Sequence, residues 1–222
     1  MSDRAPLLLV IALAALLPLG AALAKDWPDV PLPEGAQGEW VSRHMVYNGL
    51  NMRASRFMVA AKADAVEAFY RQAWKGEVVR NTLGRKTILG RADGDHFITV
   101  ELTAKVGGTQ GQIGIMEMAK PKGTPGNGFA KMPGTRVYED IVYLDTPQRS
   151  RSLNMHNRNS PYQNERFYAR ELAARGYVRE PGSMACESSS AMCISYFIKG
   201  DDRIVVSLNR QGDGTSIVAL DM

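Results

Sequence analysis

Residues 94–109 read GDHFITVELTAKVGGT, and residues 200–215 near the end of the chain read GDDRIVVSLNRQGDGT. Both stretches begin with Gly-Asp, end with Gly-Thr and alternate apolar with polar residues, as a strand with one buried face does. The aligned apolar pairs are Ile98 with Ile204, Val100 with Val206, and Leu102 with Leu208. Such self-similarity predicts a duplicated unit, although short strands between Gly-Asp turns also resemble one another by chance.

A first unit is expected over residues 41–118. Asn48-Gly49 supplies the two positive-φ positions of a tight hairpin turn. Residues 63–74 carry apolar side chains at helical spacing, ending in Tyr70 and Trp74, and predict an amphipathic helix. Three further strands complete a ββαβββ unit, in which the helix covers one face of an antiparallel sheet.

A second unit is expected over residues 135–222. Its helix begins at Ser160-Pro161, ends near Gly176, and carries Tyr168 where the first helix has Tyr70. A Gly/Pro-rich linker over residues 119–134 separates the units, and a Pro-rich extended lead-in covers residues 25–40. The predicted class is therefore α+β, with two tandem ββαβββ units and one helix per unit. Duplication would allow the two units to lie side by side about a pseudo-twofold axis and to share one continuous sheet.

The N-terminus resembles an export signal. A short head with Arg4 precedes the apolar run of residues 5–24, which ends Ala-Leu-Ala before Lys25. Cleavage is expected between Ala24 and Lys25, which would make the protein periplasmic or secreted with no stable membrane span. The alternative is an uncleaved helix that anchors the chain in the inner membrane, because twenty mainly apolar residues can just span a bilayer.

Cys186 and Cys193 are the only cysteines. In an oxidising compartment such a pair forms a disulfide, and here it would close a loop between two extended segments. The alternatives are a redox pair or metal ligands. Their spacing is not CxxC, and the chain has no further thiol to complete a zinc site.

The charge balance is even, with a net charge of +4 from 27 basic and 23 acidic residues. A nucleic-acid binder would concentrate its basic residues, so no nucleic-acid partner is expected. The three histidines, His44, His96 and His156, form no metal-binding or catalytic motif. We therefore expect no catalytic residues, no metal and no cofactor.

Two sets of residues are candidates for binding. Tyr70, Trp74, His96 and Tyr168 would line a small-ligand site between helix and sheet, although an aromatic stripe at this spacing more often faces a core. The second set consists of arginines that could hold an anionic group or the carboxylates of a partner: Arg53, Arg56, Arg149, Arg151 and Arg158. The competing interpretation of the arginines is a solvated strand face that discourages edge-to-edge aggregation.

The sequence alone favours an exported, non-catalytic protein that binds a protein partner of the bacterial cell envelope. A small-ligand binding protein, with its site between helix and sheet or at the seam of the two units, ranks second. A hydrolase that uses His96 and a nearby carboxylate ranks third.

Overall fold

The computed structural model describes residues 27–147 and 149–222. The first half of the chain contains β1 (Gln37–Tyr47), β2 (Leu50–Val59), α1 (Ala63–Ala73), β3 (Val79–Leu83), β4 (Lys86–Asp93), β5 (His96–Lys105) and β6 (Gly108–Glu117). The second half contains β7 (Arg136–Tyr143), β8 (Ser150–Asn157), α2 (Pro161–Ala174), β9 (Val178–Arg179), β10 (Met192–Lys199), β11 (Asp202–Gln211) and β12 (Gly214–Asp221).

The predicted α+β class is wrong. The structure is 50% strand and only 13% helix, and its body is a single twelve-stranded antiparallel sheet, so the fold is β-rich. Each half also has four strands after its helix, where the sequence predicted three. The additional strands are β3, all of whose residues are exposed, and β9, which has two residues. Neither shows the alternation of buried and exposed positions by which a strand is recognised in a sequence.

The sheet runs in the order β3-β4-β5-β6-β2-β1-β7-β8-β12-β11-β10-β9. The strands of the two halves therefore follow equivalent orders outward from the centre of the sheet, where β1 pairs with β7. This joint contains three residue pairs, with Val46 opposite Val142 in the middle. Two backbone hydrogen bonds extend it, from the N–H of Leu144 to the carbonyl oxygen of His44 and from the N–H of Asn48 to that of Asp140.

The strand registers of the two halves correspond at constant offsets. Val59 pairs with Thr109 in the first half, and Asn157 pairs with Thr215 in the second. The offset is 157 − 59 = 98 for β2 and β8, and 215 − 109 = 106 for β6 and β12. Both threonine hydroxyls donate a hydrogen bond of 2.7 Å to a carbonyl oxygen just before the helix, that of Ala61 or of Asn159.

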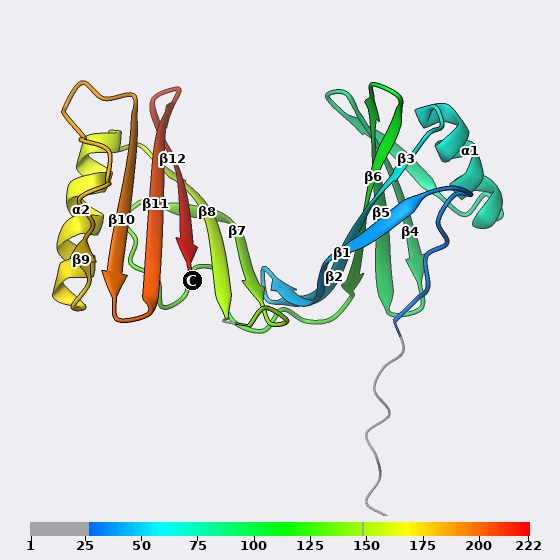
Figure 1. Cartoon of the computed structure of the whole chain (residues 1–222). Coiled ribbons are helices and arrows are strands. Elements are labelled where there is room, and N and C mark those ends of the chain that lie inside the picture. The colour runs from blue at the N-terminus through cyan, green and yellow to red at the C-terminus, as the bar shows by residue number, and fades with distance from the viewer. Residues whose placement is uncertain (1–26, 148) are drawn as a thin grey trace, which may run out of the picture.

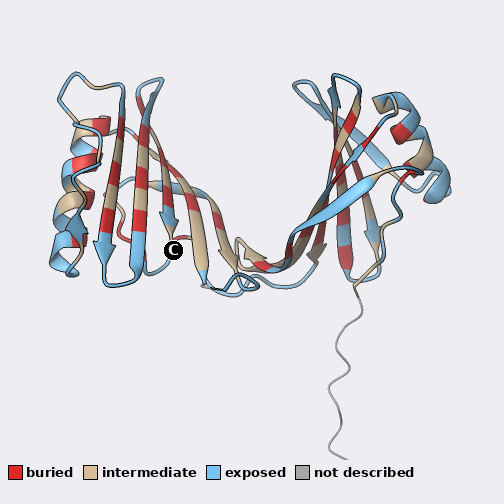
Figure 2. Cartoon of the chain, in the orientation of Figure 1, coloured by how far each residue is buried: buried red, intermediate tan, exposed pale blue. Residues whose placement is uncertain are grey.

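Each half buries one face of its strands beneath its own helix (Figure 1). The first core includes Phe57, Tyr70 and Val100, and the second includes Tyr168 and Leu208. The helices lie on the two outer sides of a U-shaped sheet (Figures 1 and 2). We call the helix-bearing side of the sheet the outer face. The opposite side, which neither of the two described helices covers, is the inner face.

Local sequence explains where the helices and turns form. Ser160 caps α2, since its hydroxyl accepts from the N–H of Gln163 while the Gln163 side chain accepts from the N–H of Ser160. The turn between β1 and β2 places Asn48 and Gly49 at positive φ, 48° and 85°, as the Asn-Gly pair predicts. The residues preceding β1 and β7 pack on the outer face, with Val30 against the first core and Phe129 in the second.

Tyr70 and Tyr168 occupy equivalent places in the two cores, and burial raises the pKa of both phenols. Neither hydroxyl has a hydrogen-bond partner in the described part of the chain. We expect Tyr70→Phe and Tyr168→Phe to leave the free energy of unfolding unchanged or to raise it by up to about 1 kcal/mol, because an unsatisfied buried hydroxyl is removed. Tyr70→Ala, which leaves a cavity, should lower it by about 3–5 kcal/mol. Urea denaturation measures both effects, and a clear destabilisation by Phe would contradict this interpretation.

Candidate functional site

The inner face of the sheet carries a row of apolar side chains across its middle. Directly opposed residues of an antiparallel pair lie on the same face. The cross-strand pairs of this row run through β7, β1, β2, β6 and β5: Tyr143–Met45, Met45–Met52, Met52–Met116 and Met116–Phe97. Phe97 lies between His96 and Ile98, which are buried on the outer face, so the row belongs to the inner face.

A second apolar row enters from the other half and reaches the same joint. Its cross-strand pairs run through β10, β11, β12, β8, β7 and β1: Tyr196–Val205, Val205–Leu220, Leu220–Ser152, Ser152–Ile141 and Ile141–Tyr47. The two rows occupy neighbouring positions where β1 pairs with β7. Figure 2 shows the two arms of the sheet facing one another across this inner side.

Two ion pairs lie within the inner face. Arg56 bonds to Glu39 at 2.5 Å, and Lys86 bonds to Glu101 at 2.8 Å, each pair being formed across adjacent strands. The hydroxyl of Tyr47 donates to Glu139 at 3.1 Å, and burial together with this carboxylate raises the pKa of Tyr47. The face therefore carries its apolar rows together with these paired polar groups.

A separate polar pocket of about 470 Å³ lies on the outer face of the first half, at the end near the joint. We call it the Trp27 pocket, and its lining residues are Trp27, Arg43, His44, Asn51, Arg53, His96 and Glu117. It brings together His96 and Arg53, which the sequence analysis had placed in different candidate sets.

Trp27 organises one wall of this pocket. Its ring lies 4.9 Å from the His96 ring and 4.6 Å from the guanidinium carbon of Arg53. The amide of Asn51 donates to Glu117 at 2.8 Å. Arg53 Nε is buried and has no hydrogen-bond partner among residues 27–147 and 149–222. The pocket therefore presents a guanidinium whose flat face is covered by an indole ring.

The other predicted lining residues lie inside the cores. Tyr70 and Trp74 are buried beneath α1, with ring centroids 5.0 Å apart, and Tyr168 is buried beneath α2. The structure therefore does not bring these three residues together with His96 in the Trp27 pocket.

The five candidate arginines do not share one surface. Arg56 lies on the inner face with Glu39, Arg149 is exposed, and Arg158 lies 3.8 Å from Asp213 in an exposed pair. Arg53 lines the Trp27 pocket, and Arg151 is held by Asp140 on the outer face of the second half.

The Arg151–Asp140 pair is bidentate. Arg151 Nε and Nη2 donate to the two carboxylate oxygens of Asp140 at 2.8 and 2.7 Å, and the N–H of Gly126 donates to Asp140 at 2.7 Å. Burial by itself would raise the pKa of Asp140, but the hydrogen bonds from Arg151 and Gly126 outweigh it and hold that pKa below its ordinary value. This pair joins β7 and β8 to the segment that crosses between the halves.

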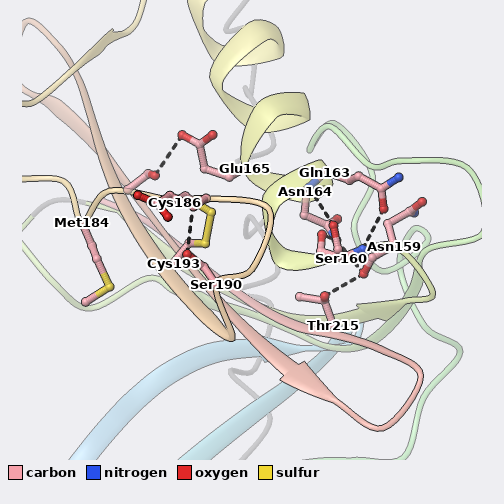
Figure 3. Close-up of a disulfide and its surroundings, with 12 residues drawn as sticks. Asn159, Ser160, Gln163, Asn164, Glu165, Met184, Cys186, Ser190, Cys193 and Thr215 are labelled. Carbon is pink, nitrogen blue, oxygen red and sulfur yellow. Dashed lines mark hydrogen bonds between the residues drawn. A yellow bond between two sulfur atoms is a disulfide. The ribbon is translucent and has the colours of Figure 1, made fainter.

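Cys186 and Cys193 form a disulfide, as predicted (Figure 3). Cys193 is fully buried on the outer face of β10, and Cys186 packs against the same core. The segment before the loop is bonded to the outer edge of β10, where the N–H of Met184 donates to the carbonyl oxygen of Ile194. A disulfide is compatible with export. The predicted signal peptide and its Ala24–Lys25 cleavage site lie outside the described residues.

Within residues 27–147 and 149–222, no helix is long and apolar enough to cross a membrane. The same residues contain no group of three or more His, Cys, Asp or Glu side chains placed to hold a metal ion. Comparisons with protein-family models, with curated proteins and with solved structures find no match. Functional proposals therefore rest on the geometry of the chain.

Sequence reasoning missed the inner-face row, although one signal for it was present. Along β2, Met52 and Met58 lie on the inner face, and Phe57 between them lies on the outer face. This pattern shows that apolar residues occupy both faces of the strand. The partners Met45 and Met116 become neighbours only through the strand registers.

Asp140→Asn should remove about 2 kcal/mol of stability at pH 7, because a largely buried guanidinium loses its carboxylate. The pKa of Asp140 is depressed in the folded state, so this stabilisation is complete above the unfolded-state pKa of about 3.9 and is lost as the pH falls through the folded-state value. Denaturant titrations between pH 7 and pH 2 measure the difference between native and variant. Asp213→Asn, in the exposed pair with Arg158, is the control and should change little. A cost that stays constant across this pH range would contradict the assignment.

Replacing both Cys186 and Cys193 by Ser should lower the free energy of unfolding by about 2–3 kcal/mol, the loop-closure contribution of a short loop. Guanidinium denaturation of the double variant and of the reduced native protein gives the comparison. The two should unfold at similar midpoints, both below the oxidised protein. Equal midpoints for the oxidised and reduced proteins would show that the disulfide does not contribute to stability.

Proposed function

We propose that this chain is an exported, non-catalytic binding protein of the cell envelope that holds a protein partner against the inner face of its sheet. The observation that carries the proposal is the pair of apolar rows that meet at the β1–β7 joint, on the face that neither α1 nor α2 covers. Exposed apolar side chains gathered on one face of a protein mark an interaction site.

The composition of the face indicates the kind of partner. Three methionines stand side by side in one row, and methionine side chains adapt to irregular apolar surfaces. The nearby charges are neutralised within the face, by Arg56–Glu39 and Lys86–Glu101. A partner that presents an uncharged, apolar surface fits this face better than an acidic or basic one.

Two inner-face side chains can be matched with two elsewhere for a test. Met58 and Phe97 lie on the inner face and are 45% and 40% exposed. Met184 lies in the segment before the disulfide loop and Leu32 in the lead-in before β1, and both are 41% exposed. The matched exposure means that both pairs of substitutions by Glu should have similar small effects on folding.

We expect the double variant Met58→Glu, Phe97→Glu to lose at least about tenfold of its partner recovery from a periplasmic extract, because buried apolar anchors carry most binding energy. The control Met184→Glu, Leu32→Glu should recover the partner as the native protein does. Quantitative mass spectrometry of the eluates gives the ratio.

Equal recovery by both double variants would contradict the proposal, as would the absence of any reproducible partner. Binding of the native protein to phosphatidylglycerol vesicles, lost with the inner-face variant while no protein is recovered, would assign the face to lipid instead.

A further inference from the structure

The two halves hold equivalent arginines in different ways. The offset of 98 that relates β2 to β8 places Arg53 at the position of Arg151. The residue opposite Arg53 on β6 is Ile115, and the residue opposite Arg151 on β12 is Asp221. The comparison is therefore between two arginines at one position of the same strand arrangement.

The second half supplies this arginine with acids. Asp140, which lies opposite Leu153 on β7, accepts from Arg151 through both Nε and Nη2. Asp221 lies directly across from Arg151 on β12, and Arg151 lowers the pKa of Asp221 against the raising effect of burial, which dominates. Both donors on the Nε edge of Arg151 are thus hydrogen-bonded to Asp140.

The first half has no acid at either position. Leu153 corresponds to Ser55, and the residue opposite Ser55 on β1 is Trp40, which stacks on Arg43 at 4.5 Å. Ile115 replaces the second acid. Arg53 therefore meets an indole ring on its face and lacks a carboxylate at its Nε edge. A buried N–H of a charged group that makes no hydrogen bond costs free energy.

The space beside Arg53 is an open pocket. The Trp27 pocket, of about 470 Å³, falls in the size range of small-ligand sites, about 300–1,000 Å³. Among the described lining residues, the charged groups are the guanidiniums of Arg43 and Arg53 and the carboxylate of Glu117, which Asn51 engages. The balance favours an anion, and His96 and Trp27 supply flat apolar walls.

We propose that the Trp27 pocket binds the carboxylate of a small organic acid at the guanidinium of Arg53, which lines the pocket. A planar carboxylate fits two parallel N–H groups of a guanidinium, and the stacked indole ring keeps the guanidinium in one orientation. This site is on the opposite face of the sheet from the proposed protein interface and does not depend on it.

The test uses succinate as the probe and the purified full-length protein, labelled with ¹⁵N. Titration should shift the side-chain Nε–H resonance of Arg53 and the indole resonance of Trp27, with a dissociation constant below about 1 mM. Succinamide, which has the same shape without the charge, should bind at least about tenfold more weakly. A tripeptide with a free C-terminal carboxylate, compared with its amidated form, shows whether a chain terminus also serves as the source of the carboxylate.

Arg56 provides the matched control, since it lies on the same strand but on the inner face. Arg53→Gln and Arg53→Lys should each weaken succinate binding at least about tenfold, the lysine variant because it keeps the charge but lacks the two-pronged edge. Arg56→Gln should bind as the native protein does. Thermal unfolding of each variant verifies that it is folded, and Arg53→Lys supplies the test if Arg53→Gln does not fold.

Three results would overturn the inference. The first is that neither succinate nor the peptide acid shifts the Arg53 resonance. The second is that succinamide binds as well as succinate. The third is that Arg56→Gln weakens binding as much as the Arg53 variants do.

Discussion

The pairing of β1 with β7 is the constraint on which the rest of the molecule depends. Only three residue pairs form the ladder there, yet they turn two helix-backed halves into one sheet. Side chains reinforce the joint from both directions. Asn48 accepts from the N–H of Asp140 and donates to the carbonyl oxygen of Tyr138, and Asp145 accepts from the Ser42 hydroxyl at 2.8 Å. These contacts involve the turn after β1 and the residues after β7, so the short ladder is fixed at both ends.

The joint also determines what the sheet can offer to a partner. Each helix packs on one face of its own half. The opposite face is therefore covered by neither α1 nor α2 along the whole described sheet. An antiparallel sheet tolerates this when its second face is polar. Here Met45 is nearly buried on that face, and Met52 and Phe97 continue the apolar row into open surface. The outer face thus stabilises the fold by packing against the helices, whereas the apolar rows of the inner face pack against neither helix.

Much of the local structure could be predicted from the sequence, because it depends on neighbouring residues. The Asn48-Gly49 turn, the helix from Ala63 and the capping of α2 by Ser160 all follow from short-range rules. The disulfide followed from the only two cysteines and their export context. The α+β class was wrong because β3 and β9 lack alternation and because the sheet turned out to be one continuous structure that outweighs two short helices. Registers between distant strands, which place Met116 beside Met52, are set by packing and cannot be read locally.

The two halves share the contacts that dock each helix but differ at the equivalent arginine positions. Two sets of contacts are the same in both halves, since the helix must dock in the same way. Thr109 and Thr215 each bond to the carbonyl oxygen just before a helix, and the aromatic neighbours on each helix pack edge to face, Phe69 with Tyr70 and Phe167 with Tyr168. Where the framework does not require a particular residue, the halves differ. In the second half the Arg151 position is neutralised by acids of the same chain, which fixes the crossing segment through Asp140. In the first half the equivalent Arg53 is stacked on Trp27, and no described residue bonds to its Nε, so the two halves hold the same arginine position in different ways.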